Sequence, residues 1–159
     1  MSETDDYVAI RRLQNAYADV VTRRAWAELP ELFVPDAPIG VDTRGGDPMT
    51  FAGGQALVDF ISVAMARFKF FEFVILNTVI EIGVGGDADA AAGRMFMCEL
   101  RTEVESGKWT NAFGVYHDRY CRRGGPWRFE RRRYHSLART NADDPTEVFE
   151  LPRLALDEL

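Results

Sequence analysis

The stretch from Trp109 to Ser136 constrains the fold more than any other part of this sequence. Its two segments, TNAFGVYHDRYCRR and WRFERRRYHS, are rich in aromatic and other β-favouring residues, and the pair Gly124-Gly125 separates them. Two roughly alternating segments joined at a glycine pair indicate an antiparallel hairpin. The sequence therefore predicts a sheet organised around a long hairpin over residues 109–136.

Placing the two glycines at the tip of the hairpin sets a register between its strands. The expected opposed pairs are Tyr120 and Phe129, Asp118 and Arg131, Tyr116 and Arg133, and Gly114 and His135. With strict alternation all eight residues share one face. A slip of one residue would move one strand's side chains to the other face, so the predicted site depends on this register.

Length and composition indicate one domain. A chain of 159 residues can bury about 70% of its unfolded surface in one core. The sequence has no apolar run of about 18 residues and no signal-peptide pattern, which predicts a cytoplasmic protein without a membrane partner. A net charge of −6 argues against nucleic acid as a partner. Cys98 and Cys121 lack the spacing of a zinc site or a disulfide framework.

Hydrophobic periodicity places helices before strands along the chain. Helical spacing predicts a first helix from Thr4 to Arg24, a short second helix over 26–33, and a third helix over 57–68 entered through Gly53-Gly54. Short strands are expected at 39–41 and 49–51, and long strands at 70–84 and 90–104, before the hairpin. Helices on one side of an antiparallel sheet make an α+β fold. In such a fold we expect the third helix to be buried against the sheet through Leu57, Phe60, Ile61, Ala64 and Phe68.

The end of the chain differs in composition from the rest. Residues 1–140 form the predicted domain, and residues 141–159 form an acidic tail with two prolines. The tail also carries apolar residues, namely Val148, Phe149, Leu151, Leu154 and Leu156. We expect these side chains to dock over the domain or on a neighbouring subunit.

Several segments, taken in order, resemble the SnoaL-like branch of the NTF2-like superfamily. They are AYADVVTRRAWAELPELFVPDA at 16–37, LNTVIEI at 76–82, and the pattern of Tyr116, Asp118, Trp127 and Arg131. The resemblance implies a cone-shaped barrel in which three N-terminal helices pack on a strongly curved, mostly antiparallel sheet around an apolar pocket. It also implies a homodimer or homotrimer. Members include polyketide cyclases, scytalone dehydratase, a bile-acid dehydratase and dehydrochlorinases.

The resemblance also shows what this chain lacks. Dehydratase and dehydrochlorinase members use an Asp four residues before the Trp of the second helix, and a His four residues before the Asn of the third strand. Here these positions hold Thr22 and Phe73. Threonine cannot act as a carboxylate base and phenylalanine cannot carry a proton, so the dyad is absent. An acidic residue of the bile-acid dehydratase matches Glu99.

The predicted register places Glu99 and His135 in one row across three strands. A second hairpin with its tip at Ser106-Gly107 puts Glu99 opposite Gly114, which lies opposite His135. The outer two Cα atoms would be about 10 Å apart with no side chain between them. Such a pair could act as a general base. The alternative is that Glu99 belongs to a solvated edge and His135 lies on the surface.

Other candidate site residues also have a structural interpretation. Asp118, the third candidate catalytic residue, would pair with Arg131 and hold a ligand carbonyl or hydroxyl, or simply fix the register. His117 points to the opposite face and is expected to be packed or at an interface. The candidate ligand-binding residues would line the pocket if the cone is hollow and form core otherwise: Tyr17, Phe73, Met95, Met97, Tyr116, Trp127, Phe129 and Arg131.

Three hypotheses for function follow. The first is a cofactor-free and metal-free dehydratase, isomerase or cyclase that acts on a polyketide-, steroid- or aromatic-like compound. The second is a non-catalytic ligand-binding or subunit-interaction protein that has lost the dyad. The third is a subunit analogous to the small β subunits of ring-hydroxylating dioxygenases, which share this architecture.

Overall fold

A computed structural model describes residues 2–140 and 146–156 of the chain. It contains the helices α1 (Glu3–Arg23), η1 (Trp26–Leu32), α2 (Gly53–Met65) and η2 (Val84–Gly86). The strands are β1 (Pro38–Asp42), β2 (Met49–Ala52), β3 (Phe68–Ile82), β4 (Ala90–Glu103), β5 (Trp109–Cys121), β6 (Arg128–Thr140) and β7 (Glu147–Val148). None of the helices in the described part is long and apolar enough to cross a membrane.

The first helix starts slightly earlier than its sequence pattern indicated. Ser2 is the N-cap: its Oγ accepts a hydrogen bond from the Asp5 backbone N–H at 3.2 Å, and its own N–H donates to the Asp5 carboxylate at 2.9 Å. This reciprocal capping box satisfies backbone donors that the first turn leaves free. At the other end, Arg24 takes the left-handed conformation, φ 58°, and closes the helix.

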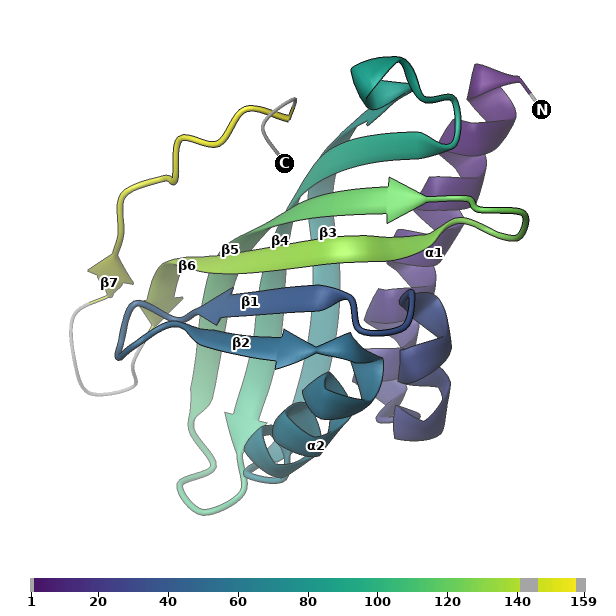
Figure 1. Cartoon of the computed structure of the whole chain (residues 1–159). Helices are drawn as coiled ribbons and strands as arrows, with labels where there is room; N and C mark the ends of the chain where they lie inside the picture. The colour runs from purple at the N-terminus through teal and green to yellow at the C-terminus, as the bar shows by residue number, and fades with distance from the viewer. Residues whose placement is uncertain (1, 141–145, 157–159) are drawn as a thin grey trace.

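The fold is α+β, and its sheet is strongly curved. Its strand order is β2-β1-β6-β5-β4-β3 with β7 paired to β6, and every pairing is antiparallel except β1 with β6. Figure 1 shows the long strands curling around α1 and α2, and the curl stays open because β2 and β3 form separate edges. The helices therefore close one side of a concave surface, and this side holds the main core.

The central hairpin has a bulge that corrects the predicted register. Tyr120 pairs with Phe129 as predicted, but the register shifts at the next step, so Asp118 pairs with Arg132 and Tyr116 with Tyr134. One extra residue on β6 reverses the predicted faces of the residues that follow it, up to a second shift between Ser136 and Ala138. Consequently the predicted pairs of Asp118 with Arg131, Tyr116 with Arg133 and Gly114 with His135 are wrong.

The register between β4 and β5 also differs from the prediction, but by two residues. Glu99 pairs with Ala112 instead of Gly114, and Met97 pairs with Gly114. A shift of two residues keeps each side chain on its predicted face because strand side chains alternate with period two. Glu99 therefore still faces the concave side.

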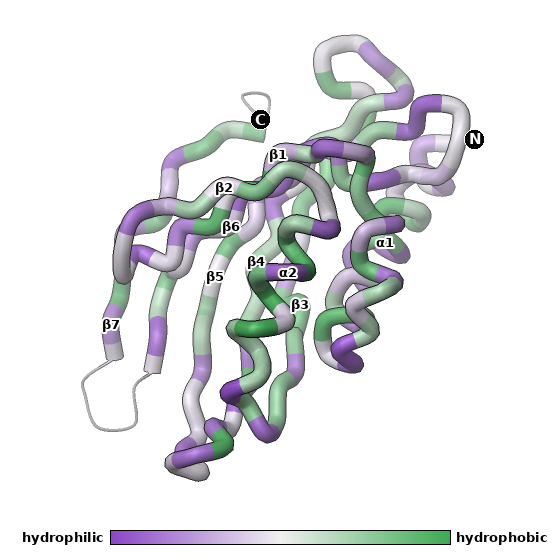
Figure 2. The backbone as a smooth tube through the Cα atoms, turned by 60° about the horizontal axis from the view of Figure 1, so that its bottom comes forward, coloured by the Kyte–Doolittle hydropathy of each residue, from purple (hydrophilic) through white to green (hydrophobic). Residues whose placement is uncertain are grey.

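The helix α2 covers the open end of the concave surface. Its residues are mostly hydrophobic in Figure 2, and it lies beside β1 and β2. Leu57 and Phe68 are buried as predicted, whereas Phe60 and Ile61 are half-buried and Ala64 is exposed. The expected burial of Ala64 is therefore wrong. The last turn of α2 lies over a hollow that its side chains do not fill.

The described part of the tail follows the outer face of the sheet, away from α1 and α2 (Figure 1). The Phe149 backbone N–H donates to the Leu137 carbonyl at 2.8 Å. Leu156 is 7% exposed and packs in a small cluster with Ala92 and Leu154. Val148 and Leu151, in contrast, are exposed. The rest of the predicted tail, residues 141–145 and 157–159, lies outside the described residues.

Candidate functional site

A cavity of about 210 Å³ lies between the concave face of the sheet and α2. Its apolar wall comes mainly from α2 and β1. Its polar groups come from α1, β4, β5 and β6, and from Thr43 and Arg67 in connecting segments. The lining residues that carry chemistry are Tyr17, Glu99, Tyr116, Arg132 and Tyr134. An apolar hollow with a few converging polar groups is the usual form of a small-molecule site.

Arg132 is the most unusual residue of the cavity because its charge is completely buried. Its Nε donates to Asp118 Oδ1 at 2.8 Å and its Nη2 donates to Asp118 Oδ2 at 2.9 Å. Neither side chain is exposed to solvent. The remaining nitrogen, Nη1, is buried and has no hydrogen-bond partner among the described residues. Nη1 is thus an unpaired donor on a residue that lines the cavity.

Aromatic rings fix the position of the Arg132 guanidinium. Its central carbon lies 4.1 Å from the ring centre of Tyr17, 4.0 Å from that of Tyr116 and 4.2 Å from that of Phe129. These cation–π contacts partly replace the water that the cation loses on burial. The guanidinium is therefore held rigidly.

A chain of hydrogen bonds supports Asp118 from behind. The Tyr120 hydroxyl donates to Asp118 Oδ2 at 3.0 Å and accepts from Gln14 Nε2 at 2.8 Å. Gln14, which is fully buried on α1, accepts in turn from Arg11 at 2.8 Å. A buried charge whose neighbours are all satisfied has little freedom to move, so the network orients Arg132.

Glu99 is the acidic group of the cavity. Burial raises the pKa of its carboxyl, while the nearby charges of Arg101 and Arg67 act in the opposite direction. Arg101 Nη1 lies 3.3 Å from Glu99 Oε2. A partly desolvated carboxyl group with a raised pKa can exchange protons nearer neutral pH than an ordinary glutamate.

Three tyrosine hydroxyls belong to the region between Glu99 and Arg132. Burial raises the pKa values of Tyr17, Tyr116 and Tyr134, and the charge of Glu99 contributes to the increase in all three. These hydroxyls consequently stay protonated at physiological pH and serve as hydrogen-bond donors instead of bases. The cavity thus combines one carboxyl group of raised pKa with several tyrosine hydroxyls that can donate hydrogen bonds.

The sequence matches the SnoaL-like domain family over residues 2–133. The chain belongs to this family. No curated protein matches it at a significant level. The family membership accounts for the curved sheet, the covering helices and the hollow between them.

Solved structures of other proteins share the fold of this SnoaL-like protein. The structure of LinA has 22% sequence identity and a TM-score of 0.76, with 94% of this chain and 96% of that chain covered. The hexachlorocyclohexane dehydrochlorinase LinA-type3 from Novosphingobium barchaimii has 24% sequence identity and a TM-score of 0.74, with 94% of this chain and 97% of that chain covered. A putative scytalone dehydratase from Novosphingobium aromaticivorans has 18% sequence identity and a TM-score of 0.71, with 94% of this chain and 93% of that chain covered.

The structure does not bring the predicted Glu99–His135 pair together. The β6 bulge turns His135 to the outer face, where its ring lies 6.2 Å from that of His117. Arg131 also lies on the outer face and does not pair with Asp118, which is buried behind Arg132. The expected dyad therefore has no geometric basis, because the sheet separates its two members.

The predicted ligand-binding residues divide into three groups. Tyr17 and Tyr116 line the cavity. Phe73, Met95, Met97 and Phe129 are buried in the core beside it. Phe129 contacts the Arg132 guanidinium, and the ring of Phe73 packs against those of Tyr17 and Tyr116. Trp127 packs against α1, where its indole N–H donates to Asp6 at 3.0 Å, outside the cavity.

Thr22 and Phe73, which replace the dyad, are still neighbours. The Phe73 backbone N–H donates to Thr22 Oγ1 at 3.0 Å. This contact ties α1 to β3 and leaves no group at these positions that could exchange a proton. Any proton transfer in this chain must therefore use other residues.

Sequence reasoning missed Arg132 and Tyr134. Both were assigned to the wrong face by the unbroken alternation of β6. A signal was present: Phe129 and Tyr134 are five residues apart, so two apolar rings can share the buried face only if one extra residue intervenes.

Proposed function

We propose that this SnoaL-like protein binds a small, mainly apolar ring compound that carries a hydrogen-bond acceptor, and transfers a proton on it without a cofactor. The observation that carries the proposal is the free Nη1 donor of the rigidly held Arg132, in the same cavity as Glu99. The acceptor would bind to Arg132 and the tyrosine hydroxyls. Glu99 would take or give the proton.

The size of the cavity limits the ligand. An apolar cavity of about 150 Å³ holds benzene, and ordinary ligand pockets begin at about 300 Å³. The 210 Å³ found here lies between them and suits one ring with short substituents better than a steroid or an extended polyketide. The dehydrochlorinase of the same fold is named for hexachlorocyclohexane, which is also a single ring.

The two ends of the site are separated along the strands. Arg132 is opposite Asp118, Asp118 is opposite Gly93, and Gly93 is six residues from Glu99. Six residues would span about 20 Å in a flat strand. The curvature and the lengths of the two side chains shorten this separation. The ligand would thus be anchored at the Arg132 end and protonated or deprotonated near the Glu99 end, as in dehydration or isomerisation.

Deuterium exchange tests the proposal without knowledge of the natural substrate. A panel of cyclic enones and single-ring hydroxy ketones would be incubated with the protein in D2O and followed by NMR. The wild type should accelerate C–H exchange of at least one compound, and Glu99→Gln should abolish this exchange while the compound still binds. Glu72→Gln, on the exposed side of β3, is the matched control and should exchange normally.

A non-catalytic binding role is the second candidate, and the contact between Thr22 and Phe73 favours it. In this case a compound would bind and protect the protein against thermal unfolding, but neither the wild type nor the variant would accelerate exchange. Arg132→Met should still weaken binding, because the free Nη1 donor would be lost. Absence of both binding and exchange across the panel would contradict both candidates.

A further inference from the structure

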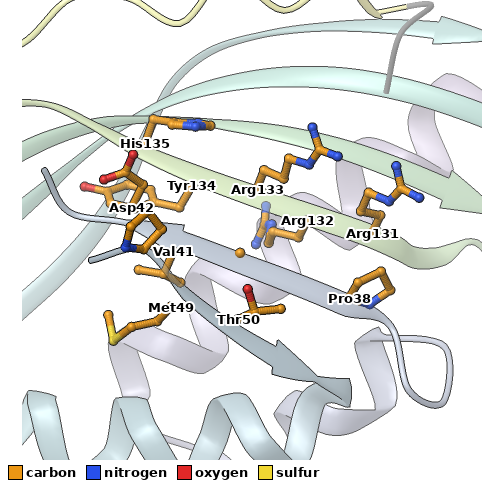
Figure 3. A pocket seen from close by; sticks show the side chains of 12 residues that line it. Pro38, Val41, Asp42, Met49, Thr50, Arg131, Arg132, Arg133, Tyr134 and His135 are labelled. Carbon is orange, nitrogen blue, oxygen red and sulfur yellow. The ribbon is translucent and has the colours of Figure 1, made fainter. Parts of the chain in front are cut away.

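A second hollow lies on the opposite face of the sheet from the cavity. It is a groove of about 430 Å³ that runs over β1, with β6 on one side and β2 on the other (Figure 3). Gly40 pairs with Arg133 on one side and with Thr50 on the other. Since Gly40 has no side chain, the floor of the groove between these two neighbours is open.

Two arginines of β6 face this groove from the same side. Arg131 and Arg133 are two residues apart, which places their Cα atoms about 6.6 Å apart along the strand and their side chains on one face. Figure 3 shows the two guanidinium groups extending side by side from β6. Neither has a hydrogen bond or an ion pair with any residue in the described part of the chain. Arg119, by comparison, lies 3.7 Å from Glu130.

Two imidazoles lie beside the arginines. His135 lines the groove, and its buried Nδ1 has no partner in the part of the chain that the structure describes. Beside it, His117 is 1% exposed, and neither of its ring nitrogens has a partner there. His117 lies between Arg94 and Arg133 across the sheet. Leaving buried polar atoms unpaired is costly, so this arrangement calls for an explanation.

Of the described residues that line the groove, one is acidic. Asp42 is the acidic residue that lines the groove, and Arg44 Nε lies 3.4 Å from its Oδ2. Burial, followed by the charges of His135, Arg94 and Arg133, lowers the pKa of His117 to about 4. Burial and the charge of Arg44 likewise lower the pKa of His135. Within the described residues that line the groove, no acidic side chain therefore pairs with Arg131 or Arg133.

We propose that this groove binds a small, doubly charged oxyanion of the phosphate class, free or as the ester group of a small molecule. Arg131 and Arg133 are the main donors and His135 is the third. One guanidinium can satisfy both oxygens of a carboxylate, whereas three separated donor groups match the several oxygens of a tetrahedral anion. The open floor at Gly40 gives the anion room beside the Arg133 stem, whose Cγ lies 3.8 Å from an added Cβ.

The test is a titration of the full chain with inorganic phosphate at constant ionic strength, followed by calorimetry and by the imidazole NMR signals. Phosphate should bind saturably and shift the His135 signal. Arg131→Gln and Arg133→Gln should each weaken binding at least tenfold. Arg12→Gln, which removes an exposed charge on α1, is the control and should bind as the wild type does. Phenyl phosphate distinguishes the two sources: tighter binding than phosphate indicates an ester, and equal or weaker binding indicates the free anion.

Gly40→Val provides a test that keeps every charge. The new side chain would fill the floor of the groove, so phosphate binding should be lost while the melting temperature stays close to that of the wild type. Two results would overturn the proposal. One is the absence of saturable phosphate binding to the wild type, and the other is an equal weakening in Arg12→Gln and Arg133→Gln.

Discussion

Arg132 and Asp118 form a two-point ion pair at 2.8 and 2.9 Å in which neither side chain is exposed. The pair links the core to the cavity, because Asp118 accepts from two nitrogens of the guanidinium, while the third, Nη1, has no partner among the described residues. Its surroundings consist of aromatic rings on the cavity side and the hydrogen-bonded Tyr120 behind it. The same interaction therefore supports both the stability of the sheet and the proposed anchor for a ligand.

Removing one partner of this pair should be strongly destabilising. We expect Asp118→Asn to lower the free energy of unfolding by about 3–5 kcal/mol, because it leaves a buried guanidinium uncompensated. Urea denaturation measures the loss. Asp19→Asn is the control: Asp19 pairs with Arg23 on the surface, with 59% of its side chain exposed, and should lose less than about 1 kcal/mol. Equal losses in the two variants would contradict the role assigned to Asp118.

Trp127 and Trp109 provide a matched pair for testing where the core ends. Trp127 is 4% exposed and donates a hydrogen bond to the buried Asp6, whereas Trp109 is 54% exposed. Trp127→Ala should cost roughly 3–5 kcal/mol of unfolding free energy. Trp109→Ala should cost about 1 kcal/mol or less, since it loses a surface stacking on Phe70 and an exposed hydrogen bond to Asn111 Oδ1. A loss below about 1 kcal/mol for Trp127→Ala would be inconsistent with its burial.

Most of the fold could be predicted from local patterns. The spacing of apolar residues located α1 and α2, and Gly124-Gly125 located the turn of the central hairpin, because helix and strand periods are properties of the chain itself. The SnoaL-like architecture followed from the order of these segments. The end of α1 was placed within one residue, since the left-handed Arg24 closes it.

The site was harder to predict because it depends on one residue of β6. The residues from Glu130 to Arg133 are all charged, so their composition does not indicate where the strand bulges. The bulge nevertheless turns Arg132 to the concave face of the sheet and His135 to the outer face. The buried position of Arg132 was also unexpected, since arginines are usually exposed. Only the three rings and the carboxylate gathered by the tertiary structure make its burial tolerable.

Gly114 allows the Tyr134 ring to lie directly over β5. A Cβ at Gly114 would be 2.2 Å from Tyr134 Cε2, so Gly114→Ala must displace that ring. Because Tyr134 lines the cavity, the variant should lose stability and bind ring compounds differently. Thermal unfolding and a ligand titration measure the two effects.

Two further variants separate this effect from a general cost of replacing glycine. Gly114→Ala combined with Tyr134→Ala removes the clash, so the added cost of the Gly114 change should largely disappear in that background. Gly46→Ala is the control, because nothing lies within 4 Å of the added Cβ, and its stability should be unchanged. If the cost of Gly114→Ala is the same with and without the Tyr134 ring, this ring is not what requires the glycine.

Glu99 should give the protein a distinctive dependence of stability on pH. Its pKa is raised in the folded state, chiefly by burial, so folding favours the protonated carboxyl. Well below the ordinary glutamate pKa the carboxyl is neutral in both states and contributes no cost. As the pH rises from the ordinary pKa through the raised one, ionisation becomes easier in the unfolded chain than in the folded one, and stability is lost. Glu99→Gln cannot ionise and should avoid this loss.

The measurement is the difference in unfolding free energy between the wild type and Glu99→Gln from pH 3 to pH 8. We expect the variant to gain on the wild type as the pH rises above about 4.3 and the gain to level off above the folded-state pKa. Glu72→Gln, which alters an exposed side chain, should show a nearly constant difference. The opposite slope, with the wild type gaining as the pH rises, would mean that the attraction of Arg101 at 3.3 Å outweighs burial. Glu99 would then be a permanently charged anchor, and its proposed role in proton transfer would be excluded.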